Sequence, residues 1–201
     1  MSTAAVIGTK GVPRPRREQQ IIDVAIGEFA ARGYAGASMV EIARLAGISK
    51  PLVYQYFGSK NGLYLACLHQ VAADLLARLT AAERQVDDTV ASRIHPLRAV
   101  FEALEPRREV WRLLYDASRP DVGPIAEAAQ SYQAAVEEIA ASGSARFLAA
   151  RGLRDDADAA VLGRVWMAVV DAAVVWWLEH PDESADAMVQ RCSRLLAAVL
   201  S

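Results

Sequence analysis

The chain has 201 residues, of which 53% are hydrophobic, and its 22 Lys and Arg against 24 Asp and Glu give a formal net charge of −2. A chain of this length buries roughly 70% of its unfolded surface, so it needs neither disulfides nor a metal to build a core. Cys67 and Cys192 lack the paired spacing of a zinc site or a disulfide framework, which indicates a reduced, cytoplasmic compartment.

No membrane segment or signal peptide is expected. The longest apolar stretch, from Val165 to Leu178, is interrupted by Asp171 and is shorter than the ~20 residues that span a bilayer. Residues 1–11 lack a basic start followed by an apolar run, which a secretory signal requires.

The near-zero total charge conceals a division along the chain. Residues 1–64 hold eight basic and four acidic side chains, a net charge of +4, whereas the remaining residues carry −6. Such an asymmetry is typical of a polyanion-binding module joined to another domain. A chance fluctuation of surface charge is the alternative.

Apolar residues recur every three and four positions, without the alternation of half-buried strands, which predicts an all-α fold. The first helix is expected over 16–32, with its apolar face towards the core and Gly33 as its C-terminal stop. Later helices are expected near 88–104, 107–118, 122–151, 156–179 and 183–200.

Residues 39–57 have the spacing of a helix-turn-helix. Ser38 and Glu41 form a capping-box pattern that opens the first short helix, and Gly47 permits the positive φ of a tight turn. Ser49 is expected to cap the second short helix. An ordinary helical hairpin is the alternative to a DNA-binding motif.

The second short helix has an unusual outward face. Placing Val53 towards the core turns outward a group of side chains that is poorly explained by solvation alone, namely Pro51, Leu52, Tyr54 and Gln55. A Gln55 amide can form two hydrogen bonds with an adenine edge, while Lys50 and Lys60 can reach phosphates. This face therefore favours the major groove of DNA.

The stretch from Gly36 to Lys60 resembles the DNA-binding signature of the TetR family of bacterial transcriptional regulators. The resemblance rests on the Ala46-Gly47 turn, the Tyr54-Gln55-Tyr56-Phe57 ending and the Ser59-Lys60 opening of the next helix, with Phe29, Gly33 and Tyr34 in the preceding one. It covers roughly residues 16–64. Elsewhere the chain is similar to the family only in length and helix count.

This resemblance implies an all-helical homodimer with an N-terminal DNA-binding domain and a C-terminal domain that binds a small molecule. It implies dimerisation through the helices near 156–179 and 183–200. It also implies phosphate contacts from Ser38, Ser49, Tyr54, Tyr56 and Lys60, and base contacts around Lys50, Pro51, Leu52 and Gln55. Gln55 stands where the family often has histidine, so the DNA sequence it reads is not carried over.

Three arginines, Arg14, Arg16 and Arg17, lie just before or at the start of the expected first helix. They are expected to form a basic arm along the minor groove or the backbone, with a solvated leader as the alternative. The expected organisation is a flexible basic arm over 1–15, a helix-turn-helix domain over 16–64, and a helical effector-binding and dimerisation domain over 65–201.

The segment 159–178 is apolar nearly all round, so a helix there must be covered on more than one face. A dimer seam, shared with residues 185–200, is expected, and a central core helix is the alternative. Candidate pocket residues are Phe101, Trp111, Tyr115, Tyr132, Trp166, Met167 and Asp171, although core roles fit most of them equally. Arg164 is a candidate partner for Asp171.

No catalytic residue, metal site or cofactor is expected. His69, His95 and His180 lie far apart and lack helical partners for a metal, and no HExxH or GxSxG motif occurs. Together with the TetR resemblance, the sequence predicts a cytoplasmic, ligand-responsive regulator, a repressor that binds a palindromic DNA operator as a homodimer. The alternatives are a constitutive DNA-binding factor without an effector and a helical enzyme or interaction module.

Overall fold

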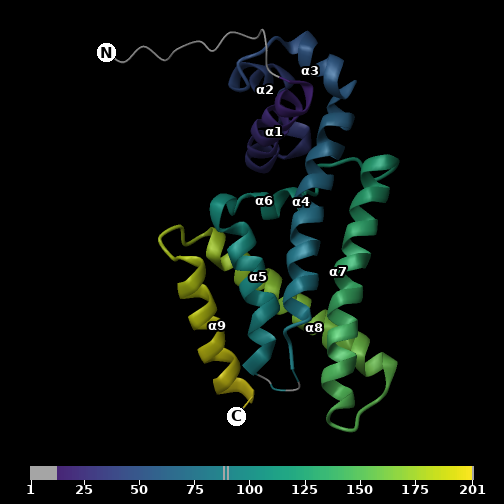
Figure 1. Ribbon diagram of the computed structural model, residues 1–201, viewed down its shortest axis with the longest axis vertical. Helices are drawn as coiled ribbons and strands as arrows, with labels where there is room; N and C mark the ends of the chain where they lie inside the picture. The colour runs from purple at the N-terminus through teal and green to yellow at the C-terminus, as the bar shows by residue number, and fades with distance from the viewer. Residues whose placement is uncertain (1–12, 88, 90, 201) are drawn as a thin grey trace. The chain divides into compact units, whose positions relative to one another are not determined.

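The computed structural model describes residues 13–87, 89 and 91–200, and helices dominate this part of the chain, which contains no strand (Figure 1). The expected all-α class is confirmed. The chain divides into two compact units: unit 1 comprises residues 1–71 and 112–128, and unit 2 comprises 72–111 and 129–201. The expected division into two domains at residue 64 does not include the finding that residues 112–128 belong to unit 1.

Unit 1 contains α1 (Arg14–Gly36), α2 (Met39–Leu45), α3 (Lys50–Phe57) and the first part of α4 (Lys60–Glu83). The predicted apolar face of α1 is buried, because Ile26 and Phe29 are at most 1% exposed. Ile42 of α2 and Val53 of α3 are fully buried in the same unit. The short helices are thus stabilised by their packing against α1 rather than by their length.

The first helix begins at Arg14, two residues earlier than expected. Pro13 occupies the N-cap and a further proline lies in the first turn, where a missing N–H costs nothing. Residues 14 and 15 of the expected arm over 1–15 therefore lie in α1, together with Arg16 and Arg17. Residues 1–12 of that expected arm lie outside the described residues.

Gly33 interrupts α1 as expected, with φ 67° and ψ 171°. The interruption exposes backbone donors that a side chain from elsewhere satisfies: the Asp116 carboxylate accepts from the backbone N–H of Tyr34 at 2.6 Å. The Ser118 hydroxyl accepts from the N–H of Ala35 at 3.2 Å. Residues 116–118 thereby cap the last turn of α1.

Unit 2 contains η1 (Ala91–Arg93), α5 (Ile94–Leu104), η2 (Glu105–Arg107), α8 (Asp156–Leu178) and α9 (Ala185–Leu200), with parts of α4, α6 (Val110–Leu114) and α7 (Pro124–Ala149). The helix expected over 107–118 is wrong in extent: η2 and turns occupy its start, and Asp116 and Ser118 leave the helix to cap α1.

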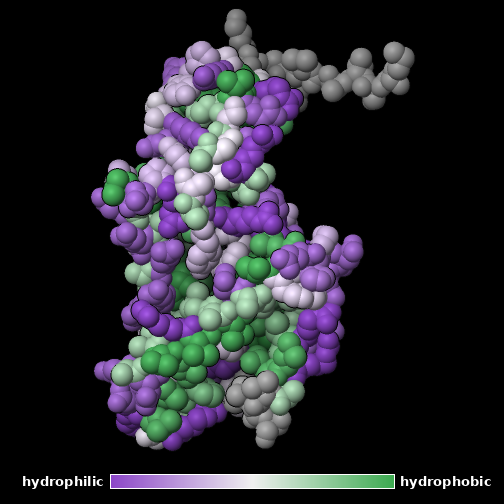
Figure 2. Space-filling view, turned by 180° about the vertical axis from the view of Figure 1, so that it is seen from behind, coloured by the Kyte–Doolittle hydropathy of each residue, from purple (hydrophilic) through white to green (hydrophobic). Residues whose placement is uncertain are grey.

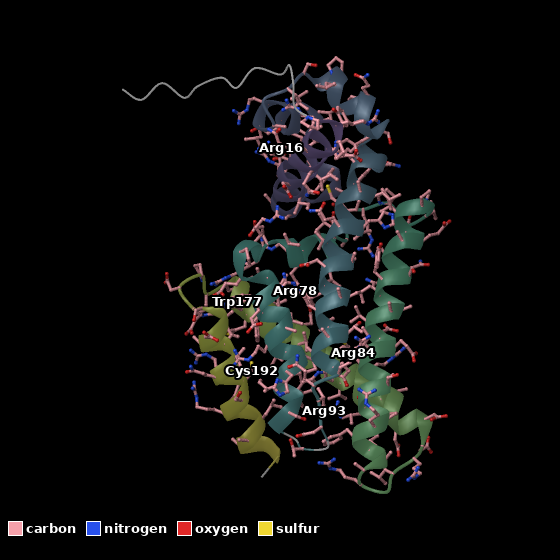
Figure 3. The ribbon with its side chains drawn as sticks, viewed as in Figure 1. Arg16, Arg78, Arg84, Arg93, Trp177 and Cys192 are labelled. Atoms are coloured by element: carbon pink, nitrogen blue, oxygen red, sulfur yellow. The ribbon has the colours of Figure 1, made fainter. Side chains whose placement is uncertain are left out.

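The core of unit 2 is centred on Trp177, labelled in Figure 3, which is fully buried. Phe101 packs edge-on against it with ring centroids 5.1 Å apart. The Arg108 guanidinium lies 4.1 Å from the centre of the Trp177 ring and donates to the carbonyls of His180, Pro181 and Glu183. Arg108 thus fixes the α8–α9 connection by satisfying carbonyls that follow the end of α8.

One face of α8 carries uncovered apolar side chains. Val161, Val165, Val169 and Val175 are 62%, 54%, 42% and 44% exposed, and Figure 2 shows hydrophobic residues gathered over this part of the molecule. By length and composition alone α8 could cross a membrane, with 22% of its most apolar window buried. The apolar run that starts at Val165 is too short to cross a membrane, but α8 is longer than this run because it begins at Asp156.

Candidate nucleic-acid interface

The entry to α2 is fixed by one hydroxyl contact and one carboxylate contact at Ser38. The Ser38 hydroxyl accepts from the N–H of Glu41 at 3.4 Å. The second half of the expected capping box is wrong: the Glu41 carboxylate pairs with Arg44 at 2.6 and 2.8 Å. The buried Glu28 carboxylate instead accepts the N–H of Ser38 at 3.1 Å. Ser38 therefore has a structural role in the motif, and a phosphate contact from its hydroxyl stays a prediction.

The turn between α2 and α3 has the expected geometry. Gly47 has φ 66°, and the N–H of Ile48 donates to the Ala43 carbonyl at 3.0 Å. A contact that sequence reasoning missed comes from α1: the Gln20 amide donates to the Ala46 carbonyl at 3.1 Å. Ser49 occupies the N-cap of α3, but its side chain forms no capping hydrogen bond, contrary to expectation.

The exposed face of α3 consists of the side chains that the helical periodicity placed there. Val53 is fully buried, whereas Pro51 and Gln55 are exposed and Tyr54 is 38% exposed. Leu52 is half-buried beside them. Helix α3 thus presents one apolar and hydrogen-bonding surface, held rigidly by the other face.

Cationic and aromatic groups flank this surface. The Lys50 ammonium lies 5.8 Å from the centre of the Tyr54 ring, and the Arg14 guanidinium lies 5.3 Å from that of Tyr56, which is half-buried. These distances allow favourable cation–π attraction. Among residues 13–87, 89 and 91–200, neither cation forms an ion pair with a carboxylate.

Lys60 has structural partners. Its ammonium donates to the carbonyls of Ala37 at 2.7 Å and Ala35 at 3.4 Å, and lies 4.8 Å from the centre of the Tyr34 ring. The Lys60 ammonium therefore stabilises the chain between α1 and α2. A phosphate contact from this residue remains a prediction, and would have to share the ammonium with these carbonyls.

The three N-terminal arginines differ in their surroundings. Arg14 and Arg16 are exposed, and Figure 3 labels Arg16. Arg17 is 7% exposed and donates to the Gln20 side chain at 2.8 Å. A DNA contact from Arg17 therefore stays a prediction, and the guanidinium would have to share its donors with Gln20.

Unit 2 contains a cavity of about 340 Å³ between the end of α4 and α7. It is lined by Thr80, Glu83, Arg84, Val86, Glu138, Ile139, Ser142 and Arg146. None of the seven predicted pocket residues lines this cavity.

The predicted pocket residues are dispersed. Phe101 and Trp111 belong to the buried core, and Tyr115 is 42% exposed in unit 1. Tyr132, Trp166 and Met167 are half-buried. Asp171 accepts a hydrogen bond from the Trp111 indole at 3.2 Å, a different partner from the expected Arg164. Among the described residues no group of three His, Cys, Asp or Glu could hold a metal.

A short exposed helix held by a tight turn against two others defines a helix-turn-helix unit of the DNA-binding class. Residues 21–67 match the model of the bacterial regulatory proteins of the tetR family. This part of the chain is therefore similar to the DNA-binding region of the TetR family of transcriptional regulators.

The chain spans about half the length of the curated relatives it matches. It is 36% identical to the HTH-type transcriptional activator FasR of Mycolicibacterium smegmatis over 105 residues, 52% of this chain and 48% of the relative. A TetR-like transcriptional regulator from Rhodococcus sp. RHA1 is 26% identical, with a TM-score of 0.68 over 94% of this chain and 98% of that one.

The fold also matches FadR of Bacillus subtilis, solved in complex with stearoyl-CoA, with a TM-score of 0.71, 16% identity and coverage of 89% of this chain and 96% of that one. These relatives are described as transcriptional regulators and none as an enzyme. This agrees with the expectation that the chain is not an enzyme.

Proposed function

We propose that the protein is a cytoplasmic, homodimeric transcriptional regulator that binds a palindromic DNA operator and is released from it by a small-molecule effector. The observation that carries this proposal is the exposed face of α3, where Pro51, Tyr54 and Gln55 are exposed while Val53 on the opposite side is fully buried. Exposed apolar and amide groups on a rigid helix suit the edges of base pairs in the major groove.

The proposed contacts divide into two kinds. Gln55 and the neighbouring Pro51 and Leu52 read bases, because an amide can pair with adenine and an apolar group can contact a thymine methyl. Lys50, Tyr54 and Tyr56 supply contacts to phosphates, together with Ser49, whose hydroxyl makes no cap. Arg14 and Arg16 extend this set at the start of α1, beside Tyr56.

Dimerisation is proposed through α8 and α9. The exposed valines of α8 form an apolar surface together with Leu195 of α9, which is 60% exposed. Exposing such a surface to water is energetically unfavourable. A second copy of the chain covers such a surface symmetrically. Two DNA-binding units are then held together, which compensates for the small positive charge of each one. Such a dimer requires a two-fold symmetric operator.

An effector site is proposed in unit 2, supported by the 340 Å³ cavity and by the ligand in the FadR structure. An effector acts if it binds more tightly to the dimer whose DNA-binding units are wrongly spaced for the operator. Effector binding then lowers operator occupancy, and the regulator represses in its absence. FasR is described as an activator, so the direction of regulation is tested separately with a promoter fusion.

The test is footprinting of the purified protein on the DNA upstream of its own gene and of the neighbouring genes. Protection of a two-fold symmetric site at nanomolar protein supports the proposal. Equal affinity for all fragments contradicts it.

The dimer has its own test in Val165→Asp, which places a carboxylate on the exposed face of α8. Analytical ultracentrifugation should show a monomer and footprinting a loss of protection. Val122→Asp is the matched control, because Val122 is 76% exposed in unit 1. A wild-type protein that is monomeric at micromolar concentration refutes the dimer.

A further inference from the structure

The cavity of unit 2 has a charged floor. The Glu83 carboxylate, 12% exposed, accepts from Arg146 at 2.6 Å and from Arg93 at 3.5 Å. Arg93 is 15% exposed and also donates to the Gly143 carbonyl at 2.9 Å. Two guanidinium groups therefore share one carboxylate, which leaves a surplus positive charge beside the cavity.

Gly143 makes this floor possible. A Cβ atom at this position of α7 would lie 2.2 Å from the Glu83 carboxylate oxygen and 2.9 Å from its carboxyl carbon. The carboxylate therefore lies directly against the α7 backbone, and a larger residue at position 143 would have to displace it. Burial raises the pKa of Glu83, although Arg93 and Arg146 lower it in part. Burying the Glu83 carboxylate is therefore unfavourable in itself, but it positions the guanidinium groups of Arg93 and Arg146.

The wall adds a further cation. Arg84 lines the cavity and forms no ion pair within the part of the chain that the structure describes. Figure 3 shows Arg84 and Arg93 near the end of α4, on the side where α7 runs. Arg146 is 54% exposed and uses one donor on Glu83, so that it has further N–H groups for a ligand.

Two other features limit what the cavity accepts. Val86 and Ile139 provide an apolar surface. Glu138, the second acidic group of the lining, accepts a hydrogen bond from the Ser142 hydroxyl at 3.4 Å. The lining itself holds two arginines and two glutamates, and Arg93, which pairs with Glu83 from outside the lining, brings the total to three cations against two carboxylates.

We propose that this cavity binds a small organic carboxylate with an apolar body, its carboxylate held by Arg84 and Arg146 and its body against Val86 and Ile139. The inference rests on the proposed effector function and names the chemical class of that effector. Arginine is well suited to the task, because its planar guanidinium donates two parallel hydrogen bonds to a carboxylate. A cavity of this volume suits a ligand of metabolite size.

Titration calorimetry of the full chain with sodium hexanoate tests the proposal. Hexylamine and hexanamide are matched probes with the same apolar chain and a positive or neutral head. Hexanoate should bind at one site per chain with a Kd of about 0.1–1 mM, the range expected for so few heavy atoms. Both matched probes should bind at least about tenfold more weakly, which is the contribution of one charge-assisted hydrogen bond.

Variants identify the site. Arg84→Gln should weaken hexanoate about tenfold without changing the fold, since no described ion pair is lost. Arg146→Lys, which keeps the charge but not the fork of donors, should also weaken it. Arg78→Gln is the matched control on α4, because Arg78 pairs with Asp74 one turn away and does not line the cavity.

Three results overturn the proposal: no saturable hexanoate binding up to about 10 mM, hexylamine binding as tightly as hexanoate, or unchanged hexanoate binding in both Arg84→Gln and Arg146→Lys. Operator binding by the unliganded protein is measured in parallel. A protein that protects its operator but fails these titrations refutes the carboxylate site alone, whereas loss of operator protection refutes the proposed function.

Discussion

Asp116 is expected to be a main stabilising residue of unit 1, because its carboxylate accepts from four donors. These donors are the N–H of Tyr34 at 2.6 Å, the hydroxyl of Tyr64 at 3.3 Å, and the N–H and hydroxyl of Ser118 at 2.8 and 2.7 Å. Asp116→Asn is therefore a severe change, since the amide NH₂ of asparagine would face donors only. We expect Asp116→Asn and Asp116→Ala to destabilise the protein to a similar extent.

The magnitude follows from the partners that lose their acceptor. The Tyr34 N–H is part-buried and donates to Asp116, whereas the Tyr64 hydroxyl also donates to the Leu113 carbonyl at 3.2 Å. At about 1.5–3 kcal/mol for a hydrogen bond to a charged group, and with Asp116 only half-buried, the total loss is about 2–4 kcal/mol. For a chain of this length it corresponds to a fall in Tm of about 5–12 °C.

The assay is thermal and urea unfolding of both Asp116 variants, with Asp121→Ala as the control at an exposed carboxylate of the same segment. Burial raises the pKa of Asp116, but hydrogen bonds from Ser118 and Tyr34 outweigh it, so that the pKa lies below the usual 3.8. The extra stability of the wild type over the Asp116 variants should therefore be fully present above pH 3.8. It should disappear as the pH falls through the lower pKa that Asp116 has in the folded protein. An Asp116→Asn protein as stable as Asp121→Ala at pH 7 would refute the acceptor argument.

Three further predictions concern the DNA-binding unit. Gln55→Ala should cost about 1–3 kcal/mol at one base position, and equal losses on operator and random DNA in a binding assay would show that Gln55 reads no base. Replacing Arg14 and Arg16 together by Ala should lower the slope of log affinity against log salt by about 0.9 per phosphate contact, and an unchanged slope contradicts their proposed role. Gly33→Ala should destabilise by about 2 kcal/mol, because φ is 67° and a Cβ would lie 2.6 Å from the Ser118 hydroxyl. Gly27→Ala, with open space around its Cβ, should be neutral or stabilising by up to about 1 kcal/mol in the same melts, and equal stability of the two variants would be evidence against strain at Gly33.

The sequence predicted those features of the DNA-binding motif that depend on residues close together in the chain. The inward position of Val53, the positive φ of Gly47 and the break at Gly33 follow from helical periodicity and from the conformations that glycine allows. These features define α2, the turn and α3, which is why the exposed face of α3 was predictable from sequence. Its proposed contacts with DNA remain predictions.

Polar contacts between distant residues were not predictable in the same way. Glu28 satisfies the N–H of Ser38, and Gln20 the carbonyl of Ala46, but neither pairing leaves a sequence pattern. The same holds for the cavity, whose floor joins Glu83 to Arg146 over 63 positions. Gly143 was the available signal, because a glycine inside a helix costs about 1 kcal/mol and therefore indicates a close approach.

The hydrogen bonds of Asp116 also show why unit 1 is discontinuous in sequence. A chain that ended at residue 64 would retain α1, α2 and α3, yet the N–H of Tyr34 and the hydroxyl of Tyr64 would lose the acceptors that residues 113–116 supply. Ile125, 2% exposed, would be missing from the core of the same unit. Helix α6 begins in unit 2 and ends within residues 112–128, whereas α7 begins within these residues and continues into unit 2. The residues that cap α1 therefore lie, along the chain, between two helices that are partly in unit 2. The DNA-binding motif is therefore local in sequence, whereas its stability is not.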